Sequence, residues 1–335
     1  MVSRLSVAAG MVSLLVAGSA AANDTTANLA AGGLVFEKTD AIEMVSEDLF
    51  VSADRVTVRY EFRNISDAPV TTIVAFPMPD IRIEPYGENV SIPTDDPDNP
   101  LGFETTIDGE SIPMALEQKA FGGDVDVTAT MVALGLPLAP QSEAARIALD
   151  ALPEESKALV VADGIAVEDS YDAGQGWEHH LAPNWTLRAT YHWEQTFRPG
   201  EIVVVEHSYQ PSVGGSVGTI LGQDWADEAD IAELRRRYCI EDNFLRAVER
   251  RTRQSAPGSI AFRESWLDYI LVTGGNWAKP IGTFRLVVDK GAPENLVSFC
   301  ASGVEKIGPT TFRVEKRDYV PEEDLRVLIL VPVDG

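Results

Sequence analysis

The chain has 335 residues, with 52 Asp and Glu against 27 Lys and Arg, so its formal net charge is −25 at pH 7. Hydrophobic residues make up 45% and charged residues 24%, which is typical of a globular protein and not of collagen, a coiled coil or a disordered chain. Because phosphate binding needs a basic surface, the charge argues against nucleic acid as a partner and against docking on anionic lipid. At about 150 residues per domain, the length predicts two domains.

The first 22 residues predict export. Arg4 supplies a short positive region, Leu5 to Ala17 is an uncharged, mostly apolar stretch, and Ala20 to Ala22 offer small residues for cleavage before Asn23. The apolar stretch is shorter than the ~20 residues of a membrane-spanning helix, although an uncleaved anchor is the alternative. We therefore expect a cleaved signal peptide over residues 1–22, no transmembrane segment in the mature chain, and a periplasmic or extracellular location.

The cysteines are consistent with export. Cys239 and Cys300 are the only two in the chain. An oxidising compartment favours their pairing, and the disulfide would close a loop of about 60 residues. The alternative is two buried free thiols. A catalytic cysteine is not expected, because a second thiol in an oxidising compartment would tend to trap it.

Alternating hydrophobic residues predict β-strands in the first half. Residues 34–39 form one expected strand. Residues 56–62 alternate between buried and exposed positions, residues 64–69 carry turn-forming side chains, and residues 70–76 return to close a hairpin. Asp108-Gly109 marks the turn of a second short hairpin.

The pattern changes to helical spacing in the middle of the chain. Residues 125–170 are expected to form a largely helical insertion between β segments. Strands resume at 186–197 and 202–209, and Pro199-Gly200 is expected to be the tip of a hairpin between them.

The second half begins with a Gly-rich segment at 213–224, which we expect to be a linker. Residues 224–253 predict an Arg-rich helix, broken near Cys239, and strands follow it. The expected fold is therefore mainly β, with two β-sandwich-like domains over 23–212 and 225–335, the helical insertion in the first and the Arg-rich helix opening the second.

Several stretches carry a resemblance to known families. Residues 56–79 and 103–120 resemble the vault/inter-α-trypsin type of β-sandwich domain, which implies a sandwich over 56–121 and brings no catalytic residue. The mature chain as a whole resembles an uncharacterised domain-of-unknown-function family of exported proteobacterial proteins, which implies a secreted or periplasmic β-rich protein and no particular activity. The second resemblance is carried by residues 31–52, 74–80, 134–138, 207–216, 238–242, 269–291 and 297–300.

Histidines suggest one candidate metal site. If Pro199-Gly200 is a two-residue hairpin tip, His192 lies opposite His207, and Glu194 is two residues along on the same face. His180, on a nearby loop, could add a further ligand for a divalent metal, with Glu194 as a ligand or a base. The alternative is a set of packed, hydrogen-bonded imidazoles, because no spacing such as H-E-x-x-H supports a metal centre.

Two further patterns suggest a hydrolase nucleophile and a calcium-binding loop, but neither meets the requirements of its site. Residues 214–218 match G-x-S-x-G, but every histidine precedes Ser216, so the Ser–acid–His order of a hydrolase is impossible. Residues 95–99 are rich in Asp but depart from the EF-hand pattern. No catalytic residue is therefore assigned, and no cofactor is expected apart from the possible metal.

An arginine-rich segment is the candidate docking surface. It could bind an acidic protein partner or a second copy of the chain, whereas its alternative role is pairing with acidic groups of the same molecule. Its residues include Arg235, Arg236, Arg237, Arg250 and Arg251.

Tryptophans suggest a third kind of site. All six lie in the second half, and Trp177 and Trp185 occur in segments expected to be loops, where they could stack on sugars or pack in the core. The leading hypothesis is a non-enzymatic exported interaction or envelope-associated protein. The alternatives are a metal-binding protein or metal-dependent enzyme, and a glycan-binding module.

Overall fold

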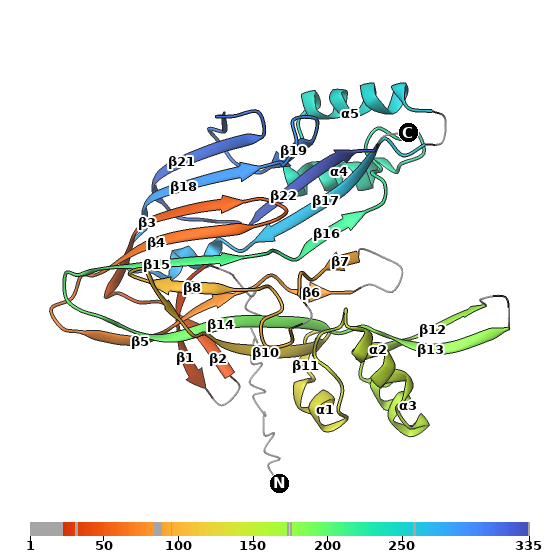
Figure 1. The fold of residues 1–335 in the computed structure, drawn as a ribbon, viewed down its shortest axis with the longest axis horizontal. Coiled ribbons are helices and arrows are strands. Elements are labelled where there is room, and N and C mark those ends of the chain that lie inside the picture. The colour runs from red at the N-terminus through yellow and green to blue at the C-terminus, as the bar shows by residue number, and fades with distance from the viewer. Residues whose placement is uncertain are drawn as a thin grey trace, which may run out of the picture.

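The computed structural model describes residues 23–30, 33–83, 89–94, 96–172, 174, 176–256 and 259–333. Three large β-sheets and one two-stranded sheet dominate this part of the chain, and helices lie at the ends of the molecule (Figure 1). The prediction of a mainly β protein is confirmed. None of the helices described is long and apolar enough to cross a membrane.

The largest sheet has eight strands and contains both halves of the chain. Strand β18 pairs in parallel with β3, with Leu286 opposite Leu49, whereas the other neighbours are antiparallel. In order across the sheet, its strands are β20 (Glu305–Lys306), β21 (Thr311–Tyr319), β18 (Ile281–Asp289), β3 (Ile42–Val51), β4 (Val56–Asn64), β15 (Ile202–Tyr209), β8 (Glu104–Ile107) and β9 (Glu110–Ile112).

Two further large sheets share a core with it. The seven-stranded sheet consists of β11 (Val125–Asp126), β10 (Ala115–Gly122), β14 (Thr186–Phe197), β5 (Val70–Pro77), β1 (Thr25–Ala30) and β2 (Gly33–Glu37), with β6 (Ile81–Arg82) on β14. The five-stranded sheet consists of β19 (Leu296–Phe299), β22 (Leu325–Pro332), β17 (Phe262–Tyr269), β16 (Val213–Ser216) and β7 (Asn89–Ser91).

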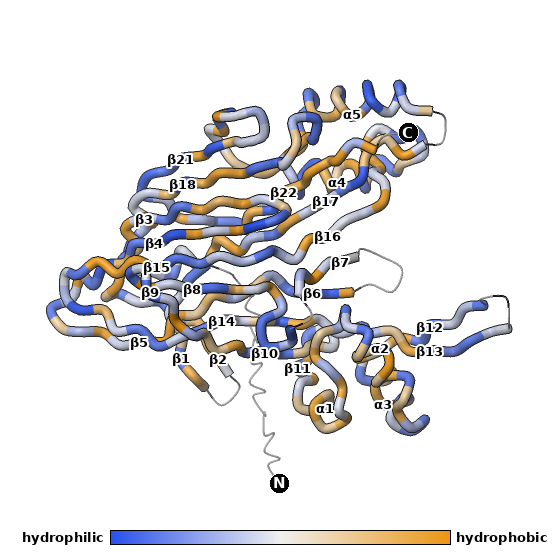
Figure 2. Tube along the Cα trace, viewed as in Figure 1, coloured by the Kyte–Doolittle hydropathy of each residue, from blue (hydrophilic) through white to orange (hydrophobic). Residues whose placement is uncertain are grey.

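A single hydrophobic core connects the three large sheets. Phe62 of the eight-stranded sheet, Phe76 of the seven-stranded sheet and Tyr269 of the five-stranded sheet are buried in one cluster. The ring centroids of Phe76 and Tyr269 are 6.2 Å apart, and the hydroxyl groups of Tyr60 and Tyr269 are 2.9 Å apart. Strand β22 is largely hydrophobic along its length (Figure 2). The segments predicted as separate domains therefore share a sheet and a core, and their independence as folding units remains a prediction.

Two predicted hairpins are wrong, and for the same reason. Strand β4 belongs to the eight-stranded sheet and β5 to the seven-stranded sheet; β15 and β14 are divided in the same way. Each short loop therefore crosses between facing sheets.

Asn64 connects these two loops by hydrogen bonds. Its carbonyl oxygen accepts from the Gly200 amide at 2.9 Å, and its Nδ2 donates to the carbonyl oxygens of Ala68 and Phe197, both at 2.8 Å. Alternation predicts which face of a strand is buried, but not which sheet the strand joins.

The remaining local predictions largely agree with the structure. Strands β8 and β9 form the hairpin expected around Asp108-Gly109. The segment 125–170 contains three helices, which pack with the buried Trp185 in a second hydrophobic cluster. They are α1 (Thr128–Ala133), α2 (Glu143–Asp150) and α3 (Glu154–Ala162), and the two-stranded sheet of β12 (Ala166–Asp172) and β13 (Trp177–Pro183) follows.

The Gly-rich segment at 213–224 begins as a strand, although we expected a linker throughout. Its first four residues form β16, which pairs with β17 and β7. A Cβ atom on Gly214 would lie 1.8 Å from Nε1 of Trp266, so a larger residue would displace the indole ring. The glycine therefore permits close packing within the sheet and does not mark flexibility.

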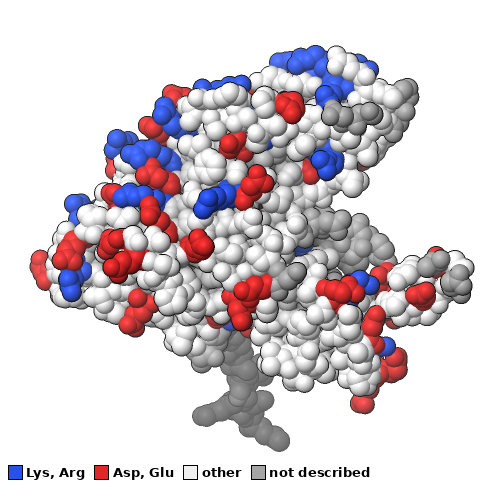
Figure 3. All heavy atoms as spheres, viewed as in Figure 1, with Lys and Arg blue, Asp and Glu red and all other residues white. Residues whose placement is uncertain are grey.

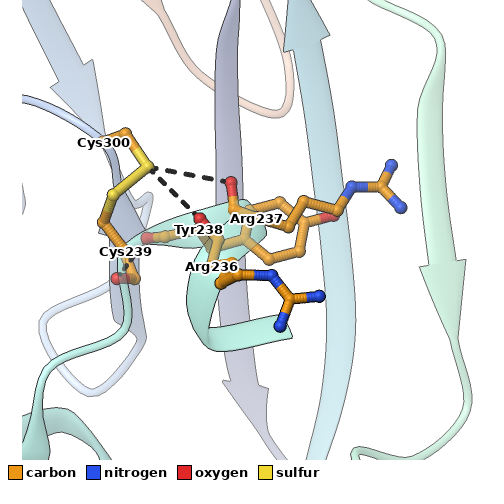
Figure 4. Close-up of a disulfide and its surroundings, with 6 residues drawn as sticks. Arg236, Arg237, Tyr238, Cys239 and Cys300 are labelled. Atoms are coloured by element: carbon orange, nitrogen blue, oxygen red, sulfur yellow. Dashed lines mark hydrogen bonds between the residues drawn. A yellow bond between two sulfur atoms is a disulfide. The ribbon is translucent and has the colours of Figure 1, made fainter. Parts of the chain in front are cut away.

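Two helices cover one end of the molecule and are joined to the five-stranded sheet by a disulfide (Figure 4). Helix α4 (Glu228–Tyr238) ends at Cys239, whose φ of 51° breaks the predicted long helix before α5 (Asp242–Gln254). Cys239 is bonded to Cys300, which directly follows β19. Tyr238 and Val248 pack the helices against Leu328 of β22.

Replacing both Cys239 and Cys300 by Ser should destabilise the folded protein by about 4 kcal/mol, because the crosslink restricts the unfolded chain over a long loop. Guanidinium unfolding of the variant and of the wild type measures this difference, and wild-type protein treated with reductant should match the variant. A variant that unfolds at the wild-type midpoint would contradict a structural role for the bond.

Candidate functional site

A cluster of buried polar side chains lies between the sheets. His207 on β15 points inward, and its Nε2 lies 3.2 Å from Oδ1 of Asp24. Its Nδ1 lies 2.9 Å from the hydroxyl oxygen of Thr105 on β8. Phe103 and Trp193 pack around the imidazole, with ring centroids 5.0 and 5.6 Å from it. Burial raises the pKa of Asp24, and the interaction with His207 offsets part of this increase.

The geometry resembles a hydroxyl–imidazole–carboxylate relay, but it is closed to substrates. Thr105 and His207 are each 2% exposed and Asp24 is 0% exposed. A nucleophile must reach its substrate, so a hydroxyl group that is buried in this way cannot begin acyl transfer in the structure observed. The cluster instead joins β8, β15 and the residue before β1 through hydrogen bonds that satisfy polar groups within the core.

A second buried carboxyl group, Glu47, lies in the same region. Strand β3 has a register shift between Met44 and Ser46, and this bulge brings Glu47 to the inner face. Gly282 permits the bulge, since a Cβ atom there would lie 2.6 Å from the carbonyl oxygen of Val45. Burial raises the pKa of Glu47 to about 8, although its hydrogen bond with Asn23 opposes the increase.

Sequence reasoning missed the roles of Asp24 and Glu47. Asp24 is the second residue after the expected cleavage position, and Glu47 lies in a strand that the pattern did not predict. For His207 a signal existed, because Val203, Val205 and Tyr209 alternate with it on one apolar face. The buried, hydrogen-bonded imidazole corresponds to the alternative considered for this histidine.

The structure does not bring His192 and His207 together as a strand pair. His192 on β14 lies opposite Ala75 and Ala115, whereas His207 lies opposite Val58 and Thr105 in another sheet. The expected register is therefore wrong, since no hairpin links β14 to β15. Within the described part of the chain, no group of three or more His, Cys, Asp or Glu residues is arranged to hold a metal ion.

His192 and Glu194 instead line an open cleft of about 810 Å³ beside β8 and β9. Apolar side chains such as Ile107 and Ile112 form part of its wall. Burial lowers the pKa of His192, which favours the neutral imidazole. The cleft offers mixed polar and apolar contacts, but His207 is not among the residues that line it.

His180 is part of a separate, more exposed cluster. Its Nδ1 lies 2.8 Å from Oδ2 of Asp150 on α2, and its Nε2 lies 3.3 Å from Oε2 of Glu178. Tyr171 stacks on the imidazole with centroids 5.3 Å apart. The hydrogen bond with Asp150 is the main cause of a raised pKa at His180. These contacts tie the helical insertion to β13.

The two tryptophans considered for sugar binding lie in different environments. Trp185 is buried, and its indole nitrogen donates to the carbonyl oxygen of Leu138 at 2.7 Å. Trp177 is 70% exposed on β13. The structure therefore does not place the two rings on one exposed platform.

The arginine-rich segment divides into paired and unpaired side chains. Arg235 contacts Asp242 at 2.7 Å, Arg236 contacts Glu233, and Arg237 lies 3.9 Å from Asp268. Arg251 donates to the carbonyl oxygens of Ala261 and Val333. By contrast, Arg246 and Arg250 are exposed on the outer face of α5, and neither has an ion pair with another described residue. Lys and Arg side chains gather over this end of the molecule (Figure 3).

Comparison with known proteins identifies the family. The model of a domain of unknown function, DUF4424, matches residues 22–328, so the chain belongs to this family. The expected family resemblance is confirmed at this level, and the vault-type resemblance of residues 56–121 remains a prediction. A search of curated proteins found no match. A solved structure from Legionella pneumophila, described as a "putative nutrient binding protein", is 16% identical with a TM-score of 0.44, covering 92% of this chain and 70% of that chain.

Asp150→Asn should lower the pKa of His180 towards its ordinary value of about 6.5, because it removes the main hydrogen-bonding carboxylate. In the wild type, the pKa of His180 is higher in the folded than in the unfolded state. Its stabilising contribution is therefore complete below the unfolded-state pKa and is lost as pH rises through the folded-state pKa. NMR titration of the imidazole checks this, with His192 as an internal control that should not shift. A wild-type pKa at or below 6.5 would exclude the ion pair in solution.

Proposed function

We propose that this protein is an exported binding protein that docks an acidic partner protein on the outer face of α5. The observation that carries the proposal is the pair Arg246 and Arg250, which are exposed one helical turn apart without an ion-pair partner among the described residues. Like charges at this spacing slightly destabilise a helix, by about 0.2–0.5 kcal/mol. A partner carboxylate placed between them would relieve this repulsion.

The negative charge of the whole chain limits which anions the basic face of α5 can bind. The net charge of −25 repels nucleic acid and anionic membranes at long range. A local basic face on such a molecule selects partners that present a small, well-placed acidic surface. The planar guanidinium groups of Arg246 and Arg250 bind carboxylates in a bidentate geometry, which adds orientation to attraction.

Helix α5, which carries these arginines, is held rigidly against the five-stranded sheet. Val248 of α5 is completely buried against the five-stranded sheet. Arg251 anchors the inner face of the same helix to backbone carbonyl groups of the sheet side. The disulfide links Cys239, which lies between α4 and α5, to Cys300 at the end of β19. Because the support is preorganised, little conformational entropy is lost when a partner binds.

Reversal of the two unpaired charges tests the proposal. Arg246→Glu together with Arg250→Glu should weaken binding of a fluorescent oligoglutamate peptide by about tenfold, equivalent to 1.4 kcal/mol. Fluorescence anisotropy at low and at physiological salt measures the affinity, and higher salt should weaken wild-type binding.

The matched control replaces Arg198 and Arg317, which are exposed elsewhere, by Glu and gives the same net charge. This control should retain binding close to the wild type. Equal losses in the two double variants would show that only total charge matters, and an absence of wild-type binding would reject α5 as an acidic-partner surface. The same pair of variants, used as bait in the host's exported fraction, would then identify the natural partner.

A further inference from the structure

The beginning of the described chain is held inside the protein by residues near position 275. The backbone nitrogen of Asn23 donates to Oγ1 of Thr273 at 2.6 Å, and the Thr273 hydroxyl donates to the carbonyl oxygen of Asn23 at 2.7 Å. The indole nitrogen of Trp277 donates to the carbonyl oxygen of Asp24 at 2.8 Å. Asn23 and Asp24 have no exposed surface. Asn23 is therefore part of the folded core.

Two buried acceptor atoms beside Asn23 have no hydrogen-bond donor within the described part of the chain. Its Nδ2 donates to Oε2 of Glu47 at 3.0 Å, but Oε1 of Glu47 and Oδ1 of Asn23 are buried without a partner among the described residues. A peptide nitrogen carries one hydrogen, and Asn23 already donates it to Thr273. An α-ammonium group carries three hydrogens, so it would supply additional donors beside acceptors that lack them.

Among the described residues, none of the groups that interact with Glu47 supplies a positive charge. Asp24 and Glu47 are both completely buried, and His207 is paired with Asp24. A buried carboxylate without a counter-ion is strongly unfavourable, so Glu47 favours its protonated form while the 22–23 peptide bond is intact. The groups that interact with Glu47 are all neutral or acidic: Asn23, Asp24, Asp48, Tyr60, Tyr269 and Tyr319.

We propose that cleavage between Ala22 and Asn23 creates a buried α-ammonium group that forms an ion pair with Glu47. Hydrolysis by a signal peptidase consumes one water molecule: the carbon–nitrogen bond breaks, Ala22 leaves as a carboxylate, and the nitrogen of Asn23 becomes the ammonium group. Because Asn23 is inaccessible in the folded protein, cleavage precedes closure of the core. Removal of residues 1–22 therefore supplies the missing charge and donors, and the mature form is more stable than the uncleaved chain.

Two forms of the chain test this proposal by guanidinium unfolding. One begins at Asn23, and the other begins at Ala22, which moves the ammonium group one residue, about 3.8 Å, along the backbone. The Asn23 form should unfold at the higher denaturant concentration, because its ammonium group forms on the residue whose side chain contacts Glu47. In the Glu47→Gln background the two forms should unfold together. Equal midpoints in the wild-type background, or an undiminished difference with Glu47→Gln, would overturn the proposal.

Amine labelling provides a second measurement that does not require Glu47→Gln to fold. Under reductive methylation, the α-amine of Asn23 should react at least about tenfold more slowly than an exposed lysine, because it reacts only when the core opens. Lys279, with a side chain 56% exposed, is the internal reference. The α-amine of the Ala22 form should react at least as fast as Lys279, because the pKa of an exposed α-amine is about 7.7–8.0, against about 10.4 for a lysine. Equal rates for Asn23 and Lys279, or an exported chain that begins at another residue, would overturn the proposal.

Discussion

The parallel pairing of β3 with β18 is the constraint on which the rest of the structure depends. It places residues 46–51 beside residues 283–288 and makes one eight-stranded sheet from both halves of the chain. The two smaller sheets pack into the same core, so neither half buries its apolar surface alone. Because the pairing closes a very long loop, its entropic cost must be offset by contacts that form only when both halves are present.

The polar cluster provides such contacts at the centre of the molecule. The hydroxyl groups of Tyr60 and Tyr269 connect two sheets, and Thr273 and Trp277 bind the backbone at Asn23 and Asp24. Each bond joins residues that are at least 200 positions apart in the sequence. Buried polar groups are costly unless they are paired, so this arrangement penalises alternative packings in which the two halves are displaced.

The sequence predicted local structure better than connectivity. Alternation identified β4 and its buried face, and the helical spacing after 125 and 224 was found because it needs only nearby residues. The sequence predicts hairpins at the loops 65–69 and 199–200, which instead cross between two sheets. A short loop between two amphipathic strands has the same local pattern whether the strands pair in one sheet or lie in two facing sheets. Asn64, which joins the two crossings, acts through contacts that no local pattern contains.

The candidate site shows the same division between local and tertiary information. The arginine-rich helix was predictable from composition, but the pairing of Arg237 with Asp268, on β17, depends on how the helix packs. His207 was identifiable as an inward polar residue on an apolar strand, whereas its partner Asp24 lies 183 positions away. Glu47 had no such signal, since the bulge that turns it inward becomes visible only in the sheet.

Burial separates the roles of the charged residues in this protein. Asp24, Glu47 and His207 lie between the sheets, where hydrogen bonding makes them part of the framework and removes them from contact with substrates. Arg246 and Arg250 are on the outside of a helix fixed to that framework, where their charges remain available at a defined spacing. The proposed recognition of an acidic partner needs only this arrangement, because binding requires a preorganised surface and no buried group needs to reach the partner.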